Sequence, residues 1–411
     1  MNFARRAGLA ALLLVCLVGA WRVAGQLQAD RLAAAEPQRA LRWRPSQPRA
    51  LLAQAEASLA AGDLAAARDS ARRLLAHEPL QGEAFRILAQ VADREGKRDQ
   101  ARRLFLVAER RAPRDLATRA WLARDAFARG DLALGLSQLD RVLRMSPAQG
   151  RALLPLMVQL ARDPAFARLL ARELAGDPPW RPAMLAALQG PKTGDVVAEG
   201  QVMQALQAQG DLSPAEYDRW LEGMMAAGRW GEAYARWASR AVKPGGRLPA
   251  VYNGDFDRPP SNAGFDWRLR RVPGVQVDFP RAEQGAAARL RFLGRRVPQG
   301  GLDHPLLLVP GEYALDMQVR GDALRTAVGL QWIVVCAGSG REIGRSEPLE
   351  GSFGWRPLET RLAVPAERCS GQWLRLVNPV AAGAAQQASG TLWVDQVRTR
   401  RLGPGTQSGV K

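Results

Sequence analysis

The chain has 411 residues, enough for two or three domains that each bury a core of their own. Its formal net charge of +18 fits an anionic partner such as nucleic acid, acidic lipid or acidic polysaccharide, or arginines spread over solvated helix faces. The sequence contains no arginine-rich recognition helix, zinc-finger spacing or RNA-binding aromatic motif, so we expect no nucleic-acid partner.

Residues 1–25 predict an export signal or a membrane anchor. Arg5 and Arg6 precede an apolar stretch over 7–21, which Arg22 interrupts. A basic start and a short apolar core are typical of a signal peptide. The stretch is shorter than the roughly 20 residues that span a bilayer, unless Arg22 extends its side chain to the interface. We expect an uncleaved anchor over a cleaved signal; the small residues at 18–20 would suit a signal peptidase, and the flanking charges leave the orientation open.

A repeat of 34 residues follows, after a linker or first helix at 26–47. Prolines, glycines and alanines recur at this spacing: Pro45, Pro79, Pro113 and Pro147; Gly62, Gly96 and Gly130; Ala55, Ala89 and Ala123. The glycine permits the turn after the first helix of a pair, the alanine lets two helices approach closely, and the proline ends the second helix. Over 48–147 the chain resembles tetratricopeptide repeat proteins. The resemblance implies an α-solenoid whose groove binds peptides or partner proteins.

We expect helices to continue, in a weakened register, so that the repeat domain spans 48–241. Residues 213–216 form a capping box that begins a helix, and Gly228 separates it from a last helix over 230–240. The resemblance places the groove along the first helix of each pair. The candidate residues for binding a protein partner there are Arg86, Gln90, Asp93, Trp121 and Arg124.

After Lys243-Pro244-Gly245-Gly246, which predicts a linker, the pattern changes to the two-residue alternation of β-strands. Eight short strands favour a β-sandwich or jelly roll over 250–402, with a disordered tail at 403–411. The expected strands cover 274–279, 288–292, 306–309, 311–320, 328–336, 356–364, 372–377 and 391–398. The predicted fold class is therefore multidomain, all-α followed by all-β.

Outside the apolar stretch, the chain has two cysteines, Cys336 and Cys369, both at strand-like positions. A lone pair in an exported domain predicts a disulfide, and the alternative is two buried thiols that act as small apolar groups. Because the N-terminus has the features of an export signal, we expect the disulfide and an oxidising compartment.

Short motifs run through the β region in a fixed order. They are Asn253-Gly254-Asp255-Phe256, Gly264-Phe265-Asp266-Trp267, Pro310-Gly311-Glu312-Tyr313, Trp355 and Trp393-Val394-Asp395-Gln396-Val397. In this order they resemble the galactose-binding-like jelly rolls found among carbohydrate-binding modules. The resemblance implies two sheets, with sugars bound on a concave face or at loop tips, and in many members a structural calcium ion.

The glycan-binding candidates are Trp267, Trp332, Trp355 and Trp393, because an indole ring stacks on the apolar face of a sugar. Tryptophans on alternating strands more often belong to the core. The neighbouring arginines at 268, 270 and 271 would suit an acidic sugar. Asp255 and Asp395 are weak calcium candidates, since a calcium site needs six or more oxygens, and we expect no other cofactor.

The sequence shows no catalytic constellation. Its two histidines, His77 and His304, have no triad or metal-site neighbours, and the Gly-x-Ser-x-Gly, P-loop and His-Glu-x-x-His motifs are missing. A degenerate glycan-processing enzyme would need two facing carboxylates in a cleft. We expect instead a non-catalytic scaffold, anchored in the inner membrane of a bacterial cell envelope with its bulk in the periplasm. Its architecture resembles accessory components of polysaccharide assembly or export. The alternative is a protein-assembly adaptor whose sandwich binds no sugar.

Overall fold

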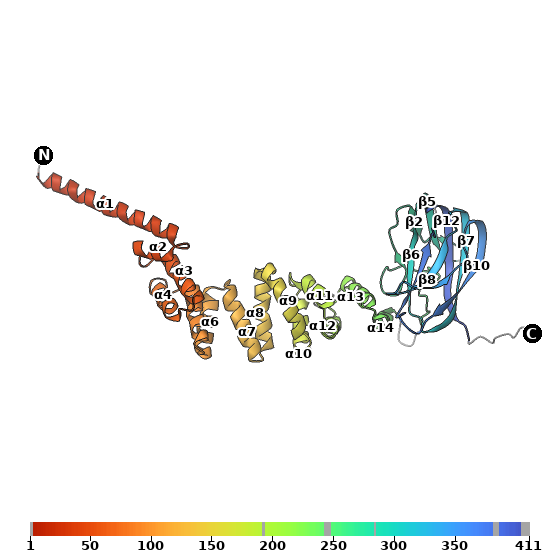
Figure 1. The fold of residues 1–411 in the computed structure, drawn as a ribbon, viewed down its shortest axis with the longest axis horizontal. Helices are drawn as coiled ribbons and strands as arrows, with labels where there is room; N and C mark the ends of the chain where they lie inside the picture. Colours follow the sequence, from red (N-terminus) through yellow and green to blue (C-terminus); the bar gives the residue numbers. More distant parts are fainter. Residues whose placement is uncertain (1–2, 191–193, 242–247, 283–284, 381–385, 404–411) are drawn as a thin grey trace, which may run out of the picture. The chain divides into compact units, whose positions relative to one another are not determined.

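The computed structural model describes residues 3–190, 194–241, 248–282, 285–380 and 386–403, in two compact units (Figure 1). The units are Met1–Asp211 and Leu212–Lys411. The predicted linker at 243–246 and the predicted tail beyond Gly403 lie outside the described residues. The first unit is helical, and the second combines two helices with the β-strands, so the predicted fold class is confirmed.

The first unit begins with one long helix, α1 (Phe3–Leu32), followed by the short α2 (Pro37–Trp43). By length and composition, Leu12–Leu32 could cross a membrane or serve as a signal sequence. Residues 26–47, expected as a linker or first helix, are therefore the end of α1 and the whole of α2. Buried alanines at positions 33, 40 and 50 join these helices to the repeats.

Three helical hairpins follow the 34-residue register. They are α3 (Pro48–Ala60) with α4 (Leu64–His77), α5 (Gly82–Arg94) with α6 (Arg98–Arg111), and α7 (Leu116–Ala128) with α8 (Leu132–Met145). Gly62, Gly96 and Gly130 have φ between 77° and 84°, in the left-handed region that closes a helix at low cost. The repeated alanines are buried, and each repeated proline lies two residues after the end of a second helix.

Four more helices complete the first unit. α9 (Pro147–Leu160) and α10 (Pro164–Ala175) continue the helical array beyond the regular register, as the sequence predicts. α11 (Arg181–Gln189) and α12 (Val196–Gln209) were not predicted. α12 begins with two exposed valines, so its apolar residues give no clear helical stripe in the sequence.

The second unit contains α13 (Pro214–Ala226), α14 (Trp230–Ala241) and a β-sandwich. The capping box at Ser213 and Glu216 is present, as predicted. The strands are β1 (Arg268–Leu269), β2 (Val275–Asp278), β3 (Arg281–Ala282), β4 (Gly285–Ala286), β5 (Ala288–Arg296), β6 (Gln299–Leu306), β7 (Gly311–Arg325), β8 (Gln331–Cys336), β9 (Glu342–Arg345), β10 (Gly351–Val364), β11 (Gln372–Val377) and β12 (Gln387–Arg401). Ten of the described strands pair antiparallel in the order β1-β6-β11-β8-β9-β10-β7-β12-β5-β2, and β3 pairs with β4. One apolar core joins residues from both halves of this order, so the sheet closes over itself as a sandwich (Figure 1).

One predicted strand was misplaced. The strand expected at 306–309 is instead β6, because Asp303, His304 and Pro305 look like loop residues but lie buried within it. Arg270 pairs with Asp303 at 2.7 Å, which compensates for part of the cost of burying that carboxylate. The ring nitrogen Nε2 of His304 lies 3.1 Å from the carbonyl oxygen of Tyr252. These polar partners allow a polar sequence to form an inner strand.

His304 makes the stability of the sandwich depend on pH. Complete burial lowers its pKa to about 3, below the ordinary 6.5 of the unfolded chain. Between these values the unfolded chain binds a proton that the folded chain does not, so stability falls as pH falls. From pH 7 to pH 5 we expect His304 to contribute a loss of about 2 kcal/mol. Unfolding midpoints of the wild type and His304→Gln, measured at both pH values, check this. An equal loss of stability between pH 7 and pH 5 in both proteins would exclude His304 as the cause.

The two helices of the second unit pack against the sandwich. The ring of Trp230 contacts Phe265 and Trp373 edge-on, with centroids 5.8 and 5.5 Å apart. Trp237 contacts Tyr252 in the same way at 5.0 Å, and Arg268 forms an ion pair with Glu222 of α13. The change from helix to strand therefore falls after α14, as expected from the sequence, whereas the compact unit begins at Leu212.

Candidate functional site

The four candidate tryptophans separate into two pairs. Trp267 and Trp332 are fully buried in the core of the sandwich, with ring centroids 6.3 Å apart. The indole Nε1 of Trp267 donates to the carbonyl oxygen of Asn253 at 2.9 Å. A fully buried ring cannot stack on a sugar, so the prediction of a glycan contact is wrong for Trp267 and Trp332.

Trp393 lies on the outer face of β12, because Leu392 and Val394 on either side point into the core. Its partner on β5 is Arg289, and its partner on β7 is Arg320. The guanidinium carbons of these arginines lie 5.1 and 5.9 Å from the centre of the indole, within the range of a cation–π interaction. The strand register therefore places one aromatic ring between two positive charges.

The row extends to the next strand. Asp278 on β2 is the partner of Arg289, so Asp278, Arg289, Trp393 and Arg320 form one line across four strands. Hydrogen bonds from Arg289 lower the pKa of Asp278, which keeps that carboxylate ionised. Arg291 also reaches Asp278, at 3.4 Å. Within the described ranges no carboxylate pairs with Arg320, so it is a charge open to a ligand. We call these four residues with Arg291 the outer-face row.

Trp355 is the most exposed of the four tryptophans, with 47% of its surface accessible. It lies on β10, where the pairing with β7 shifts between Phe353 and Arg356. This irregularity lies opposite the part of β7 that carries Arg320, so the two accessible tryptophans stand on the two strands that flank Arg320.

The arginines expected to serve an acidic sugar beside Trp267 have other partners. Arg268 is buried and pairs with Glu222, and Arg270 pairs with Asp303. Arg271 is exposed but follows a tryptophan that no ligand can reach. The positive charges on the outer-face row replace them as candidates. Sequence reasoning missed the row because it depends on the register of four strands.

The two calcium candidates do not form a recognisable metal site. Burial raises the pKa of Asp395, and the nearby negative charges of Asp255 and Asp257 raise it further. Across the described part of the chain, no three His, Cys, Asp or Glu side chains gather so as to hold a metal ion. We therefore derive no role for calcium from Asp255 and Asp395.

A second accessible surface lies between α13, α14 and residues 252–266. It is a cleft of about 360 Å³ whose lining includes Tyr217, Trp237, Arg240, Tyr252 and Arg258. The guanidinium of Arg240 lies 4.1 Å from the centre of the Tyr217 ring, and Arg258 donates to the hydroxyl of Tyr252 at 3.1 Å. Its residues come from three separate segments, so no sequence pattern indicates it.

The five candidate residues of the repeat groove separate into buried and exposed ones. Trp121 stacks on Phe105 at 4.2 Å inside the helical core, so its assignment to a binding surface is wrong. Arg86 is largely buried and pairs with Glu56 and Asp115, which makes it a link between neighbouring hairpins. Gln90, Asp93 and Arg124 keep partial or full exposure, and Arg124 pairs with Asp93 at 3.5 Å.

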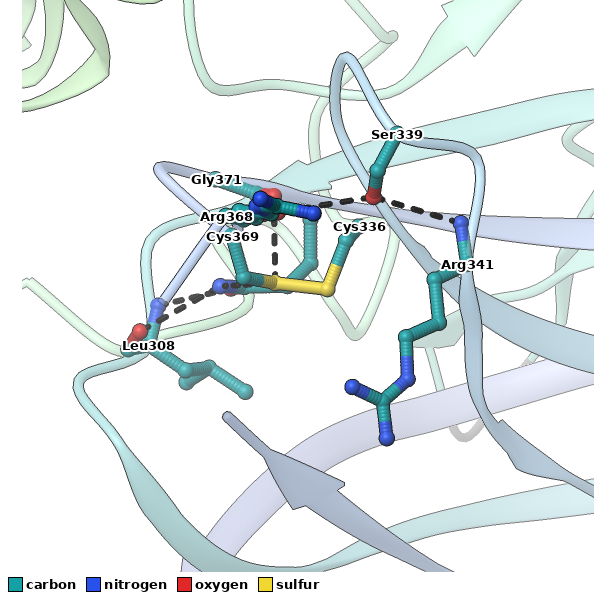
Figure 2. The surroundings of a disulfide bond; sticks show 8 residues. Leu308, Cys336, Ser339, Arg341, Arg368, Cys369 and Gly371 are labelled. Carbon is teal, nitrogen blue, oxygen red and sulfur yellow. Dashed lines mark hydrogen bonds between the residues drawn. A yellow bond between two sulfur atoms is a disulfide. The ribbon is translucent and has the colours of Figure 1, made fainter. Parts of the chain in front are cut away.

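The predicted disulfide is present (Figure 2). It joins Cys336, the last residue of β8, to Cys369, with the two Cα atoms 4.9 Å apart. Next to it, the side chain of Gln372 accepts a hydrogen bond from the backbone N–H of Leu308 at 2.9 Å. A disulfide is typical of proteins that fold in an oxidising compartment.

No protein-family model matches this chain, and no curated protein matches it. Among solved structures, a CBM4 module is 12% identical, covers 37% of this chain and 99% of its own, with a TM-score of 0.29. A CBM61 module in complex with β-1,4-galactotriose is 16% identical over 38% of this chain and all of its own, with a TM-score of 0.26. A thermophilic TPR protein of Thermus thermophilus is 17% identical over 50% of this chain and 99% of its own, also with a TM-score of 0.26. Both resemblances expected from the sequence therefore recur among solved structures.

Proposed function

We propose that this chain is a non-catalytic, membrane-anchored scaffold whose sandwich binds an acidic polysaccharide on the outer-face row. The observation that carries this proposal is the placement of Trp393 between Arg289 and Arg320. An indole ring offers an apolar surface to a sugar ring, and a guanidinium offers paired donors to a carboxylate. A polymer with regularly spaced uronic acid residues could use both at once.

The other parts of the chain fit a role in the bacterial envelope. The apolar part of α1 would anchor the chain in the inner membrane, and the disulfide would form in the periplasm. The repeats would bind a protein partner along the face that carries Gln90, Asp93 and Arg124. This arrangement would place a polysaccharide near an assembly or export complex.

A specific observation supports the alternative of an adaptor with no sugar ligand. Arg289 and Arg320 both contact the ring of Trp393, which leaves less of the indole for stacking. In that case the sandwich would be structural or would bind an acidic protein surface. The two functions differ in whether the chain binds a polysaccharide when no protein partner is present.

Affinity electrophoresis of the full chain in detergent separates these functions. We expect its migration to be retarded in gels that contain polygalacturonate or alginate, and unchanged in gels that contain dextran. Replacing Arg291 and Arg320 with alanine should remove most of the retardation, because these charges would meet the uronate carboxylates.

The matched control replaces Arg72 and Arg103, two exposed arginines of the repeats, with alanine. It removes the same charge from the chain but leaves the outer-face row intact, so its retardation should stay. Equal losses in both double variants would show general charge attraction and contradict the proposal. If Arg258→Ala alone removed the retardation, the polysaccharide site would lie in the cleft between the helices and the sandwich, and not on the outer-face row.

A further inference from the structure

The polar end of the apolar stretch carries two paired tryptophans and several arginines. We propose that Trp21, Arg22, Trp43 and Arg44 form a binding site for the anionic headgroups of membrane lipids. This inference rests on the proposed membrane anchoring and adds to it a specific partner. It would fix the first helices of the repeat unit on the membrane surface.

The geometry follows from a stripe of residues on α1. Trp21, Gly25 and Ala29 recur every four residues, so they lie on one face of the helix, and Ala33 follows directly after its last residue, Leu32. α2 packs against this face, with Ala29 and Ala33 fully or almost fully buried. A Cβ atom on Gly25 would lie 4.0 Å from the ring of Trp43, so this ring lies over the same face of α1. The rings of Trp21 and Trp43 then meet, with centroids 5.9 Å apart.

The two rings pack on each other but stay open to the surroundings. Trp21 is 69% exposed and Trp43 is 48% exposed. Just before them on α1, the large apolar side chains from Leu12 to Val18 are also exposed, as expected of a segment that contacts lipid. Tryptophan prefers the boundary between the hydrocarbon and the headgroups. The pair therefore marks the level at which α1 would leave the membrane, so that the apolar stretch over 7–21, and not the whole of Leu12–Leu32, would lie in the hydrocarbon.

The charges around the pair have one sign. Arg22 and Arg44 line a cleft of about 410 Å³ together with both tryptophans, and Arg42 lies next to Trp43. In the parts of the chain that the structure describes, none of these arginines has a carboxylate partner. The acidic residues of this hairpin, Asp30 and Glu36, lie toward its other end. Asp30 accepts a hydrogen bond from Gln47, and Glu36 forms an ion pair with Arg39.

A lipid headgroup fits this cleft better than a soluble ligand. The cleft continues directly from an exposed apolar helix, so a molecule with an apolar tail and an anionic head would contact both at once. Guanidinium groups near a membrane surface are attracted to acidic lipids. Arg22 and Arg44 would hold the phosphate, and the rings would pack on the glycerol region.

The test uses the full chain in lipid nanodiscs of two compositions, phosphatidylcholine alone and phosphatidylcholine with phosphatidylglycerol. Amide hydrogen exchange of residues 38–43 reports whether α2 is held at the surface. We expect exchange about tenfold slower in discs that contain phosphatidylglycerol, because two arginines gain an anionic partner. Arg22→Gln with Arg44→Gln should abolish the difference, whereas Arg72→Gln with Arg103→Gln should keep it.

Different outcomes contradict the proposed membrane anchor and the proposed headgroup site. Intact mass of the disc-bound chain shows whether residues 1–20 remain, so their loss would contradict the anchor and with it the headgroup site. A chain that stays intact in the discs, but whose α2 exchanges equally in both lipid mixtures, would overturn the headgroup site alone. Equal protection by inorganic phosphate in phosphatidylcholine discs would also overturn it, since the site would then not need a lipid.

Discussion

Replacing Cys336 and Cys369 with serine should lower the free energy of unfolding of the sandwich by about 3–4 kcal/mol. The two cysteines are 33 residues apart, so the bond restricts a long loop in the unfolded chain. Inside the fold, the bond ties the end of β8 to the segment before β11, close to Gln372. Chemical denaturation followed by tryptophan fluorescence, on oxidised, reduced and variant proteins, measures the loss.

Cys16 supplies the control for this experiment. It is exposed on the apolar part of α1, outside the second unit, so Cys16→Ser should leave the unfolding midpoint unchanged. Equal midpoints for the oxidised wild type and the double variant would contradict a stabilising disulfide. Free thiols at positions 336 and 369 in protein taken from its native compartment would contradict export.

Trp230→Ala should have a comparable effect and lower the free energy of unfolding of the second unit by about 3–5 kcal/mol. The ring is 3% exposed and lies between Phe265 and Trp373. A Cβ atom on Gly371 would fall 2.0 Å from the Cδ2 atom of this ring, so the backbone of the sandwich lies directly against it. Gly371 directly precedes β11, whose pairing with β6 and β8 holds this backbone, so it cannot move to fill the cavity that alanine would leave.

Thermal unfolding of the full chain measures this effect. Trp355→Ala is the matched control, because Trp355 is exposed and its loss should change stability by only about 0.5 kcal/mol. Similar midpoints for Trp230→Ala and Trp355→Ala would show that α14 does not stabilise the sandwich. The dependence on Trp230 is also the reason to use the full chain in binding assays, since a fragment that begins at 250 would expose Phe265 and Trp373.

The repeat unit was largely predictable because individual glycines, alanines and prolines recur every 34 residues. The glycines at 62, 96 and 130 adopt the left-handed conformation that the 34-residue register requires. The same register did not show which side chains face the groove. Trp121 and Arg86 occupy positions on first helices but pack between neighbouring hairpins, because a stacked array buries part of that face.

The sandwich was predictable as a fold but not as a site. Alternation along a strand separates two faces, yet it does not say which face another element covers. Trp267 and Trp373 have similar sequence surroundings, but one lies in the core and the other lies under α14. The outer-face row needed the pairing of β2, β5, β12 and β7, which strand patterns in one sequence do not contain.

The most direct test of the proposed function is the affinity of Trp393→Ala for a polysaccharide that the wild-type chain binds. Titration calorimetry on the full chain should show binding weakened about 5- to 30-fold, because loss of a stacked aromatic ring removes on the order of 1–2 kcal/mol. The free energies of unfolding of the two proteins should agree within about 0.5 kcal/mol, since Trp393 lies outside the core. An unchanged affinity in a folded variant would contradict glycan binding on the outer-face row.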